Sequence, residues 1–353
     1  MTSRHGRRQD SPFYAEKMVF GGTPRYPFSH GSNLLALPDG EMLCAWFAGS
    51  REKGTDVHIL GARLPAGADQ WSPPQMLADA PGKSLGNPVL HWAANGRLWM
   101  FYALMYGDGS VPTRPGTGWT TCKIVAKTSV DGGQTWSPDQ VLIDELGYVT
   151  RNKAIALENS DILLPLHDER DWSSRILISA DQGERWTLSE RIDAGGGFHK
   201  GNIEPALFVR RDGSILCYMR SGADRRRIWQ SISVDAGRNW SRPVEIDVAN
   251  PNSAVDLLSL GTGAVVLAFN RSEKDRRRLT LAISDDEGAT WLKYRDVEDD
   301  GREFSYPTLI QTADERIHLT YTFDQSGPPR GIKHVITNEA WVREGQRWTG
   351  GWD

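Results

Sequence analysis

A glutamate and an arginine that lie sixteen residues apart carry side chains able to bind or react with a charged substrate. Glu204 opens one apolar segment, the chain reverses at Asp212-Gly213, and Arg220 closes the returning segment. Asp-Gly favours a two-residue β-hairpin turn, so a hairpin would bring Glu204 and Arg220 to the same edge of a sheet. An arginine at the end of an apolar strand pairs with a carboxylate or binds an anion. An internal Glu204–Arg220 ion pair and an anion-binding site are both compatible with this pattern.

Other polar residues recur where apolar segments begin or end. Segment starts carry His30, Asn87, Arg151, Asn202, Asn252, Asp256 and Tyr306, and the returning segments are followed by Asp56, His167, Asp168, Glu169 and Arg276–Arg278. Carboxylates, a phenol, imidazoles and guanidinium groups can together perform acid–base and nucleophilic chemistry on an anionic substrate. Such chemistry requires a fold that brings the starts of many strands to one place.

Four copies of an eight-residue pattern, Ser-x-Asp-x-Gly-x-x-Trp, indicate that fold. They lie at Ser129–Trp136, Ser179–Trp186, Ser233–Trp240 and Ser284–Trp291, with starts 50, 54 and 51 residues apart. A repeat of this length is typical of a β-propeller, in which each unit is one four-stranded blade. Within each copy, Ser and Asp can bond local backbone N–H groups, Gly permits a turn and Trp fills the gap beside it. We interpret the pattern as a structural link between strands three and four, and not as the active site.

Six units align on this pattern, each with two apolar segments joined by a tight turn. They open at Asn33, Asn87, Asn152, Ile203, Ser253 and Ser305. Phe13–Phe20, before the first unit, is expected to be a strand that completes the last blade and removes a free sheet edge. The predicted fold is all-β: a six-bladed β-propeller of four-stranded antiparallel blades, closed by the N-terminal strand. Residues 13–353 would form this single domain and residues 1–12 a disordered tail.

Composition narrows the classes of function. The formal net charge of −4 argues against a nucleic acid or an anionic membrane as partner. Cys44, Cys122 and Cys217 are an odd number, which favours buried free thiols in a reducing compartment. Met1–Asp10 is polar and basic with no apolar stretch after it, unlike a secretory signal, so we expect a cytoplasmic protein.

The blade topology predicts which end of the propeller carries chemistry. In a meandering four-stranded blade, the turn between strands one and two lies at the same end as the turn between strands three and four. The repeated pattern marks that end, so the opposite end collects the starts of all six inner strands. The polar residues named above would therefore converge on one mouth of the central channel.

This arrangement resembles the sialidase (neuraminidase) superfamily, and in particular the six-bladed bacterial and animal exo-sialidases. The resemblance covers about Pro27 to Val342 and rests on the four repeats and on the polar residues at the strand starts. It implies a site in which three arginines hold the substrate carboxylate. A tyrosine assisted by a glutamate would act as nucleophile, and an aspartate as acid and base.

Several positions of this chain match that pattern. Glu204 stands where the family's glutamate opens its strand, Arg220 matches the second arginine, and Tyr306 in Phe304-Ser-Tyr-Pro-Thr-Leu matches the tyrosine. The third arginine corresponds to Arg276 or, equally well, to Arg278. Asp56 lies in the loop where the acid/base aspartate is expected.

The chain departs from the family at the first arginine. His30, in Ser29-His30-Gly31-Ser32, occupies that position, and Arg25 or Arg51 could supply the missing cation. The remaining candidates for substrate binding lie around the same rim: Asn87, Arg151, His167, Asp168, Asn252 and Arg330.

Three functions fit these residues. In an exo-glycosidase of sialidase type, Tyr306 would attack the anomeric carbon of a carboxylate-bearing terminal sugar, Glu204 would take its proton, and Asp56 would protonate the leaving oxygen. In a polysaccharide lyase or glycosidase on a uronate-containing oligosaccharide, His30 and Tyr306 would serve as acid and base. In a binding propeller, the same rim would hold a glycan without turnover. The expected partner is in each case an anionic oligosaccharide or glycoconjugate. No spacing of Cys, His or acidic residues suggests a metal site, and we expect no cofactor.

Overall fold

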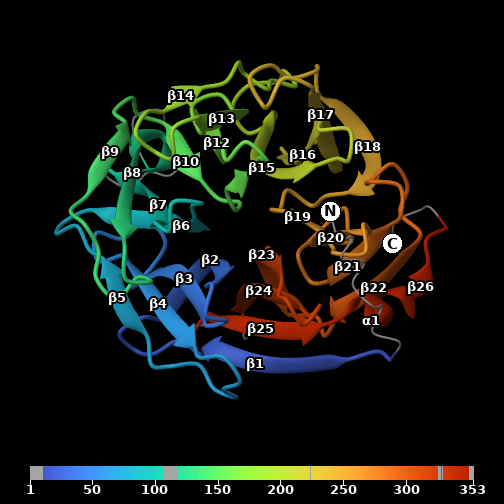
Figure 1. The fold of residues 1–353 in the computed structure, drawn as a ribbon, viewed down its shortest axis with the longest axis horizontal. Coiled ribbons are helices and arrows are strands. Elements are labelled where there is room, and N and C mark those ends of the chain that lie inside the picture. The colour runs from blue at the N-terminus through green and yellow to red at the C-terminus, as the bar shows by residue number, and fades with distance from the viewer. Residues whose placement is uncertain (1–10, 107–117, 223, 325–326, 328, 350–353) are drawn as a thin grey trace.

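The computed structural model describes residues 11–106, 118–222, 224–324, 327 and 329–349, and arranges them as six antiparallel sheets around a central axis (Figure 1). The innermost strands surround the axis, and the later strands of each sheet lie further out. Among these residues, helix is limited to α1 (Glu339–Arg343) and the 3-10 helix η1 (Gly118–Thr121). The predicted six-bladed β-propeller is confirmed. The predicted tail lies, up to Asp10, outside the described residues.

The blades follow one another along the chain. Blade one comprises β2 (Phe28–Ala36), β3 (Met42–Gly49), β4 (His58–Leu64) and β5 (Gln75–Ala78), and blade two comprises β6 (Ser84–Trp92), β7 (Leu98–Met105), β8 (Cys122–Ser129) and β9 (Gln140–Ile143). Blade three comprises β10 (Tyr148–Thr150), β11 (Ile155–Ala156), β12 (Ile162–Asp168), β13 (Ser173–Ser179) and β14 (Thr187–Leu188). Blade four comprises β15 (Asn202–Val209), β16 (Ile215–Ser221), β17 (Arg227–Ser233) and β18 (Val244–Ala249). Blade five comprises β19 (Asp256–Ser259), β20 (Val265–Asn270), β21 (Leu279–Ser284) and β22 (Lys293–Glu298), with β26 (Gln346–Arg347) at its outer edge. Blade six comprises β23 (Glu303–Gln311), β24 (Ile317–Asp324), β25 (Gly331–Thr337) and β1 (Tyr14–Phe20).

The N-terminal strand closes the ring as predicted. β1 runs antiparallel to β25, with Tyr14 opposite Thr337 and Phe20 opposite Ile332. The first strand of the chain, blue in Figure 1, therefore lies beside a red strand from the end of the chain. This pairing covers the edge of β25, which would otherwise present a row of unpaired backbone groups.

The four repeated patterns form the turns between the third and fourth strands of blades two to five. In the first copy, Ser129 Oγ donates to Asp131 Oδ1 at 2.6 Å and accepts from Gly133 N at 2.7 Å, which holds the turn together. In the second copy, Gln182 Nε2 donates to Ser160 O, in the first turn of the same blade, at 2.8 Å. Both kinds of turn therefore lie at one end of the propeller, and the predicted structural role of the pattern is confirmed.

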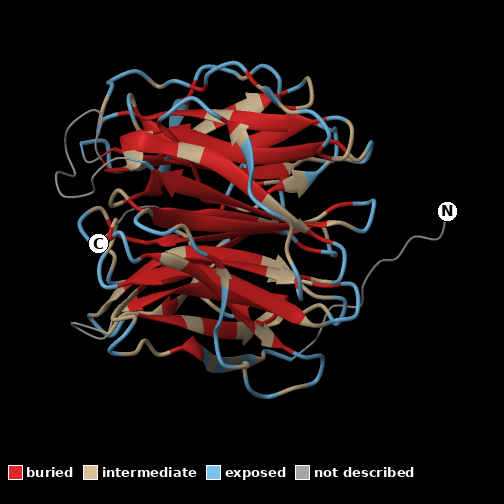
Figure 2. Cartoon of the chain, turned by 90° about the vertical axis from the view of Figure 1, so that its left-hand side faces the viewer, coloured by how far each residue is buried: buried red, intermediate tan, exposed pale blue. Residues whose placement is uncertain are grey.

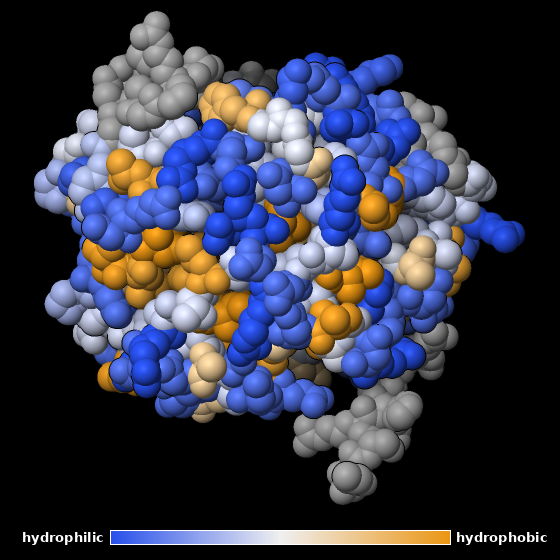
Figure 3. Space-filling view, turned by 90° about the horizontal axis from the view of Figure 1, so that it is seen from above, coloured by the Kyte–Doolittle hydropathy of each residue, from blue (hydrophilic) through white to orange (hydrophobic). Residues whose placement is uncertain are grey.

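The hydrophobic core lies between the blades. Each large cluster of buried apolar side chains combines two neighbouring blades: Leu43 of blade one packs with Met100 of blade two, and Trp46 of blade one with Ile332 of blade six. Figure 2 shows strands buried along most of their length and exposed residues in the turns at both ends. The outer edge of the disc is mostly polar, with apolar patches between (Figure 3). Because a blade buries its faces only against its neighbours, the ring is expected to fold as one unit.

The three cysteines Cys44, Cys122 and Cys217 are free and buried, as expected from their apolar surroundings in the sequence. Burial raises the pKa of each thiol, so these groups stay protonated at neutral pH. In the described part of the chain, no helix is long and apolar enough to cross a membrane.

The inner strand of blade three is broken, which the sequence did not predict. Residues 151–154 separate β10 from β11, and side chains from this gap cross the channel. Arg151 is fully buried and donates to Ser32 O of blade one and to Pro307 O of blade six, both at 3.1 Å. Lys153 Nζ lies 2.6 Å from Asp256 Oδ2 of blade five. These bonds tie four blades together and form a floor across the channel.

Candidate active site

A pocket of 240 Å³ opens at the channel mouth opposite the repeated turns. Eight predicted site residues line it: His30, Asn87, His167, Glu204, Arg220, Arg276, Tyr306 and Arg330. They come from all six blades, as the convergence of the inner strand starts requires. The volume is at the small end for ligand pockets, which favours a single sugar unit over a segment of polymer.

Three of these residues share one kind of backbone irregularity. Asn87, Glu204 and Tyr306 have φ values of 49°, 56° and 58°, and each precedes a proline. Each also lies at a bulge in the inner strand of its blade. A non-glycine residue with positive φ costs about 1 to 2 kcal/mol, and such strain is concentrated at functional sites. A bulge re-aims its side chain, so the strain accompanies the turning of all three side chains into the pocket.

Tyr306, Glu204 and Arg220 form the centre of the pocket. Arg220 Nη1 donates to Glu204 Oε1 at 2.8 Å and to the Tyr306 hydroxyl at 3.2 Å. Glu204 Oε2 is buried and has no hydrogen-bond partner in the described part of the chain. The ion pair considered from the sequence therefore exists, and it leaves one carboxylate oxygen free.

The electrostatics of this group favour a neutral tyrosine beside an ionised glutamate. Burial raises the pKa of the Tyr306 hydroxyl, and Glu204 raises it further, while Arg220 and Arg276 act in the opposite direction. Burial would also raise the pKa of Glu204, but the positive charges around it, Arg220 above all, lower it overall. Both groups accept hydrogen bonds from the same Arg220 nitrogen, which brings a phenol and an ionised carboxylate together around one cation.

Three arginines, from blades four, five and six, line one side of the pocket. Arg220 Nε donates to Asn252 Oδ1 at 2.7 Å, and Arg276 Nη2 donates to the backbone oxygen of Asn252 at 2.7 Å. Arg330 Nε donates to Asp324 Oδ2 at 2.8 Å. These bonds orient the guanidinium groups while using only part of their N–H groups. A wall of this kind suits a carboxylate, which guanidinium groups bind through paired hydrogen bonds.

On the other side, the loop after β3 contributes Glu52 instead of the expected Asp56. Asp56 is exposed and accepts from Ser50 N at 3.0 Å and from Ser50 Oγ at 2.9 Å, so its carboxylate closes the loop. Glu52 lines the pocket, and its Oε1 accepts from Trp119 Nε1 at 3.0 Å. In contrast to the expectation from the sequence, the carboxylate of this loop that lies against the pocket is Glu52 and not Asp56.

Blade three adds a histidine and a second carboxylate. His167 Nε2 lies 3.2 Å from Glu169 Oε1, and His167 Nδ1 is buried with no hydrogen-bond partner among the described residues. Nearby, the rings of Trp172 and His199 meet edge to face with their centres 4.7 Å apart. Besides His30, His167 and Tyr306, the aromatic residues that line the pocket are Phe47, Trp119, Trp172, Phe198 and His199. Aromatic faces with polar groups between them suit a sugar, which has both apolar C–H faces and hydroxyl groups.

Two predicted site residues lie behind the pocket. Arg151 is in the floor, with its guanidinium carbon 4.8 Å from the centre of the Tyr306 ring. Asn252 accepts hydrogen bonds from Arg220 and Arg276. Arg151 and Asn252 therefore contact residues that line the pocket, but neither of them lines the pocket itself.

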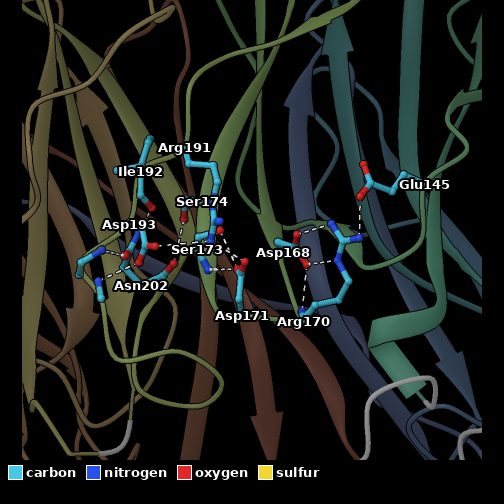
Figure 4. A network of polar contacts seen from close by, with 12 residues as sticks. Glu145, Asp168, Arg170, Asp171, Ser173, Ser174, Arg191, Ile192, Asp193 and Asn202 are labelled. Carbon is cyan, nitrogen blue, oxygen red and sulfur yellow. Dashed lines mark hydrogen bonds and ion pairs between the residues drawn. The ribbon is translucent and has the colours of Figure 1, made fainter.

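Besides Asp56, three further predicted site residues face elsewhere. Arg51 is exposed and does not line the pocket. Asp168 Oδ2 pairs with Arg170 Nη2 at 2.5 Å, and Arg170 also pairs with Glu145 (Figure 4). Arg278 Nε lies 3.7 Å from Asp296 Oδ2, which leaves Arg276 as the third arginine of the pocket. Contacts with residues that are close in space decide where these side chains lie. The pattern of strands in the sequence does not reveal such contacts.

Several lining residues were not expected from the sequence: Phe47, Glu52, Lys53, Trp119, Thr120, Trp172, Phe198, His199 and Ile203. Most lie on loops between strands. The glycine run Gly195–Gly197, directly before Phe198 and His199, is the one sequence signal that could have indicated a loop at this mouth.

A larger hollow, of 910 Å³, lies at the other mouth of the channel, between turns such as Arg210–Gly213. Its lining includes no tyrosine, histidine or cysteine. Two of its charged side chains are engaged with neighbours: Glu287 Oε1 accepts from Arg211 N at 2.8 Å, and Lys153 pairs with Asp256. We therefore take the smaller pocket as the candidate active site.

Comparisons with known proteins point to one family. BNR repeat-like domains match residues 40–319 of this chain. The sialidase of Micromonospora viridifaciens is 25% identical over 370 aligned residues, which cover 94% of this chain and 55% of the relative. A sialidase of Bacteroides fragilis is 22% identical over 283 residues, which cover 73% of this chain and 48% of the relative. The chain thus spans about half the length of these curated relatives.

Solved structures share the fold at low sequence identity. The intramolecular trans-sialidase of Ruminococcus gnavus is 17% identical, with a TM-score of 0.77 over 94% of this chain and 99% of that one. An α-L-arabinanase of Penicillium chrysogenum is 13% identical, with a TM-score of 0.66 over 95% of this chain and 100% of that one. The propeller alone therefore does not define an activity. The match over residues 40–319, the four repeats and the six-bladed ring show that this chain belongs to the family of BNR repeat-like domains, within the sialidase superfamily.

Proposed function

We propose that this protein is an exo-glycosidase of sialidase type, which releases a terminal sialic-acid-like sugar from a glycan. The observation that carries the proposal is the group of Tyr306, Glu204 and Arg220. It combines a phenol, a carboxylate with a free oxygen, and a cation bonded to both. The sialidases among the relatives support the same chemistry, and the pocket volume of 240 Å³ favours a single terminal sugar.

In the first step, the Tyr306 oxygen attacks the anomeric carbon while Glu204 Oε2 takes the phenolic proton. The bond from the anomeric carbon to the leaving oxygen breaks, and Glu52 donates a proton to that oxygen. A neutral phenol suits this carbon, because the carboxylate that it carries would repel an anionic nucleophile. The three arginines of the pocket would hold that carboxylate.

In the second step, water takes the place of Tyr306 on the anomeric carbon. Glu52, now ionised, accepts a proton from the water as its oxygen bonds to the sugar. The bond between the sugar and the Tyr306 oxygen breaks, and the proton held by Glu204 returns to the phenolate. Two successive inversions leave the configuration of the anomeric carbon unchanged.

One contact favours a second function. The His30 and Tyr306 rings lie 4.3 Å apart, centre to centre. The two side chains could serve as base and acid in β-elimination from a uronate whose carboxylate the arginines bind. We prefer the glycosidase because the elimination gives no role to Glu204, the carboxylate that shares Arg220 Nη1 with the phenol.

The test is to incubate the protein with a sialyl-oligosaccharide and, separately, with uronate-terminated oligosaccharides. We expect release of a free or anhydro sialic acid, detected by chromatography and mass spectrometry. A rise in ultraviolet absorbance from an unsaturated uronate would replace the proposal with the lyase. Glycan binding without any product would replace it with a binding role.

Asn87→Gly should separate the function of this pocket from its stability. Glycine adopts the φ of 49° found at this position without strain, so the unfolding free energy should stay within about 1 kcal/mol of the wild type. The variant removes an amide that lines the pocket without a partner in the described chain, so kcat/KM for the sialoside should fall at least about tenfold. Thermal unfolding and initial rates measure the two effects.

Ser160→Gly is the matched control. Ser160 also has positive φ, 69°, but lies in a turn at the other end of the propeller. The kcat/KM of the Ser160→Gly protein should equal that of the wild type. An Asn87→Gly protein with full activity and lowered stability would show that Asn87 serves the fold and not the substrate.

A further inference from the structure

We propose that Arg330 supplies the third cation of the carboxylate site, in place of the arginine that His30 replaces. The anion would then be held by blades four, five and six, through Arg220, Arg276 and Arg330. This inference rests on the sialidase-type function proposed above. It concerns the one position where the chain departs from the arginine pattern of the family.

The bonds around His30 favour a single uncharged tautomer. His30 Nδ1 lies 2.9 Å from Thr322 Oγ1, and the same oxygen accepts from Gly31 N at 3.2 Å. A threonine hydroxyl that already accepts from a backbone N–H can donate its own proton, and His30 Nδ1 is the acceptor within reach. The proton of His30 is therefore assigned to Nε2. The side chain offers the pocket one neutral N–H group where the family has a guanidinium.

The charges around His30 keep it in that form. Burial, and then the positive charges of Arg330, Arg276, Arg151 and Arg220, hold the pKa of His30 well below its usual range. At neutral pH the imidazole is therefore not a cation and cannot replace the missing arginine in charge. The arginine that most strongly affects His30 is Arg330, which also lines the pocket.

Arg330 is fixed beside His30 at the junction of the last and first blades. Its backbone N donates to Pro27 O at 2.9 Å, and its Nε donates to Asp324 Oδ2 at 2.8 Å. Its guanidinium carbon lies 5.4 Å from the centre of the Phe28 ring, which in turn lies 5.6 Å from the ring of His30. With Nε engaged, both terminal nitrogens lack a hydrogen-bond partner within the described ranges. A guanidinium held in this way is set to bind one carboxylate oxygen or both.

The two arginines considered from the sequence do not take this role. Arg25 is exposed, with its guanidinium carbon 5.2 Å from the centre of the Tyr26 ring, and it does not line the pocket. Arg51 is exposed as well. The replacement has thus come from the residue directly before β25 in blade six, which is distant in sequence from His30 but belongs to the neighbouring blade in the ring.

The test is the affinity of Arg330→Gln for carboxylate ligands, measured by calorimetry with N-acetylneuraminate, its methyl ester and glucuronate. We expect the variant to bind N-acetylneuraminate about 10- to 100-fold more weakly than the wild type and to bind the ester equally well, because the ester lacks the anion. Arg330→Lys keeps the charge, so its affinity for N-acetylneuraminate should lie between that of the wild type and that of Arg330→Gln. Arg185→Gln removes an arginine whose side chain is 90% exposed, at the other end of the propeller, and should change nothing.

A rescue makes the test sharper. Adding His30→Arg to Arg330→Gln returns a guanidinium to the family's own position and should restore at least part of the lost affinity for N-acetylneuraminate. Equal affinity of Arg330→Gln and the wild type would overturn the proposal. An equal loss for acid and ester would also overturn it, since Arg330 would then act through the fold, and so would a wild type that binds no carboxylate ligand.

The outcomes for the function and for Arg330 can be told apart. A protein that binds glucuronate through Arg330 but hydrolyses no sialoside would refute the sialidase-type function and keep the anion site. A protein that hydrolyses a sialoside, but whose affinity for carboxylates does not depend on Arg330, would support the sialidase-type function and refute the role of Arg330.

Discussion

Tyr306→Phe is expected to lower kcat/KM for a sialoside by at least about 10³-fold while the protein stays folded and still binds the sugar. The substitution removes the oxygen that attacks the anomeric carbon and leaves the ring in place. That ring packs beside His30 at 4.3 Å and over the buried Arg151 at 4.8 Å, so its loss would disturb the floor of the pocket. Only the 3.2 Å hydrogen bond from Arg220 is lost, and the stability should change by about 1 kcal/mol or less.

Glu204→Gln is the companion variant. Glutamine keeps an oxygen for Arg220 but cannot take the phenolic proton, so it should lower kcat by about 10² to 10⁴-fold. The pKa of Glu204 is lowered, so the base stays ionised well into acid solution, and its protonation should reduce activity only below the usual pKa of a glutamate.

A Tyr306→Phe protein with more than a tenth of the wild-type rate would rule out the tyrosine as nucleophile.

Glu52→Gln should lower kcat/KM by about 10² to 10⁴-fold on a natural sialoside, whose leaving oxygen needs a proton. On a substrate with an aryl leaving group of low pKa the loss should be much smaller, because that oxygen can depart without protonation. The dependence on the leaving group distinguishes an acid from a residue that merely shapes the pocket. Initial rates on the two substrates give the comparison.

Asp56→Asn is the matched comparison, since Asp56 lies in the same loop and was the residue expected from the sequence. Its exposed carboxylate bonds Ser50, so the substitution should weaken the loop slightly and leave the leaving-group dependence unchanged. The opposite result, with Asp56→Asn inactive on natural sialosides and Glu52→Gln active, would return the acid role to Asp56.

The parts of the site that could be predicted from the sequence lie on inner strands. Glu204, Arg220 and Tyr306 are fixed by strand order and hairpin length, which are local features, and the repeat identified the end at which the strands meet. The closing strand followed from the same count of blades. These features need no knowledge of side-chain packing.

The parts that could not be predicted depend on loop conformation or on contacts across the channel. Glu52 and Asp56 are four residues apart in one loop, and the bonds of Asp56 to Ser50 decide which carboxylate turns inward. Arg151 was expected to bind substrate, but it crosses to blades one and six and becomes the floor. The partners in such contacts come from distant blades, so the local pattern of residues carries no sign of them.

The central claim is that Tyr306 forms a covalent bond with the sugar during turnover. The most direct measurement is mass spectrometry of the protein, followed by peptide mapping, after reaction with a fluorinated sialoside that carries a good leaving group and slows the second step. The account predicts a sugar adduct on Tyr306 that forms in the wild type and is absent in Tyr306→Phe. An adduct on Glu204 or Glu52, or turnover of a sialoside by Tyr306→Phe at the wild-type rate, would contradict it.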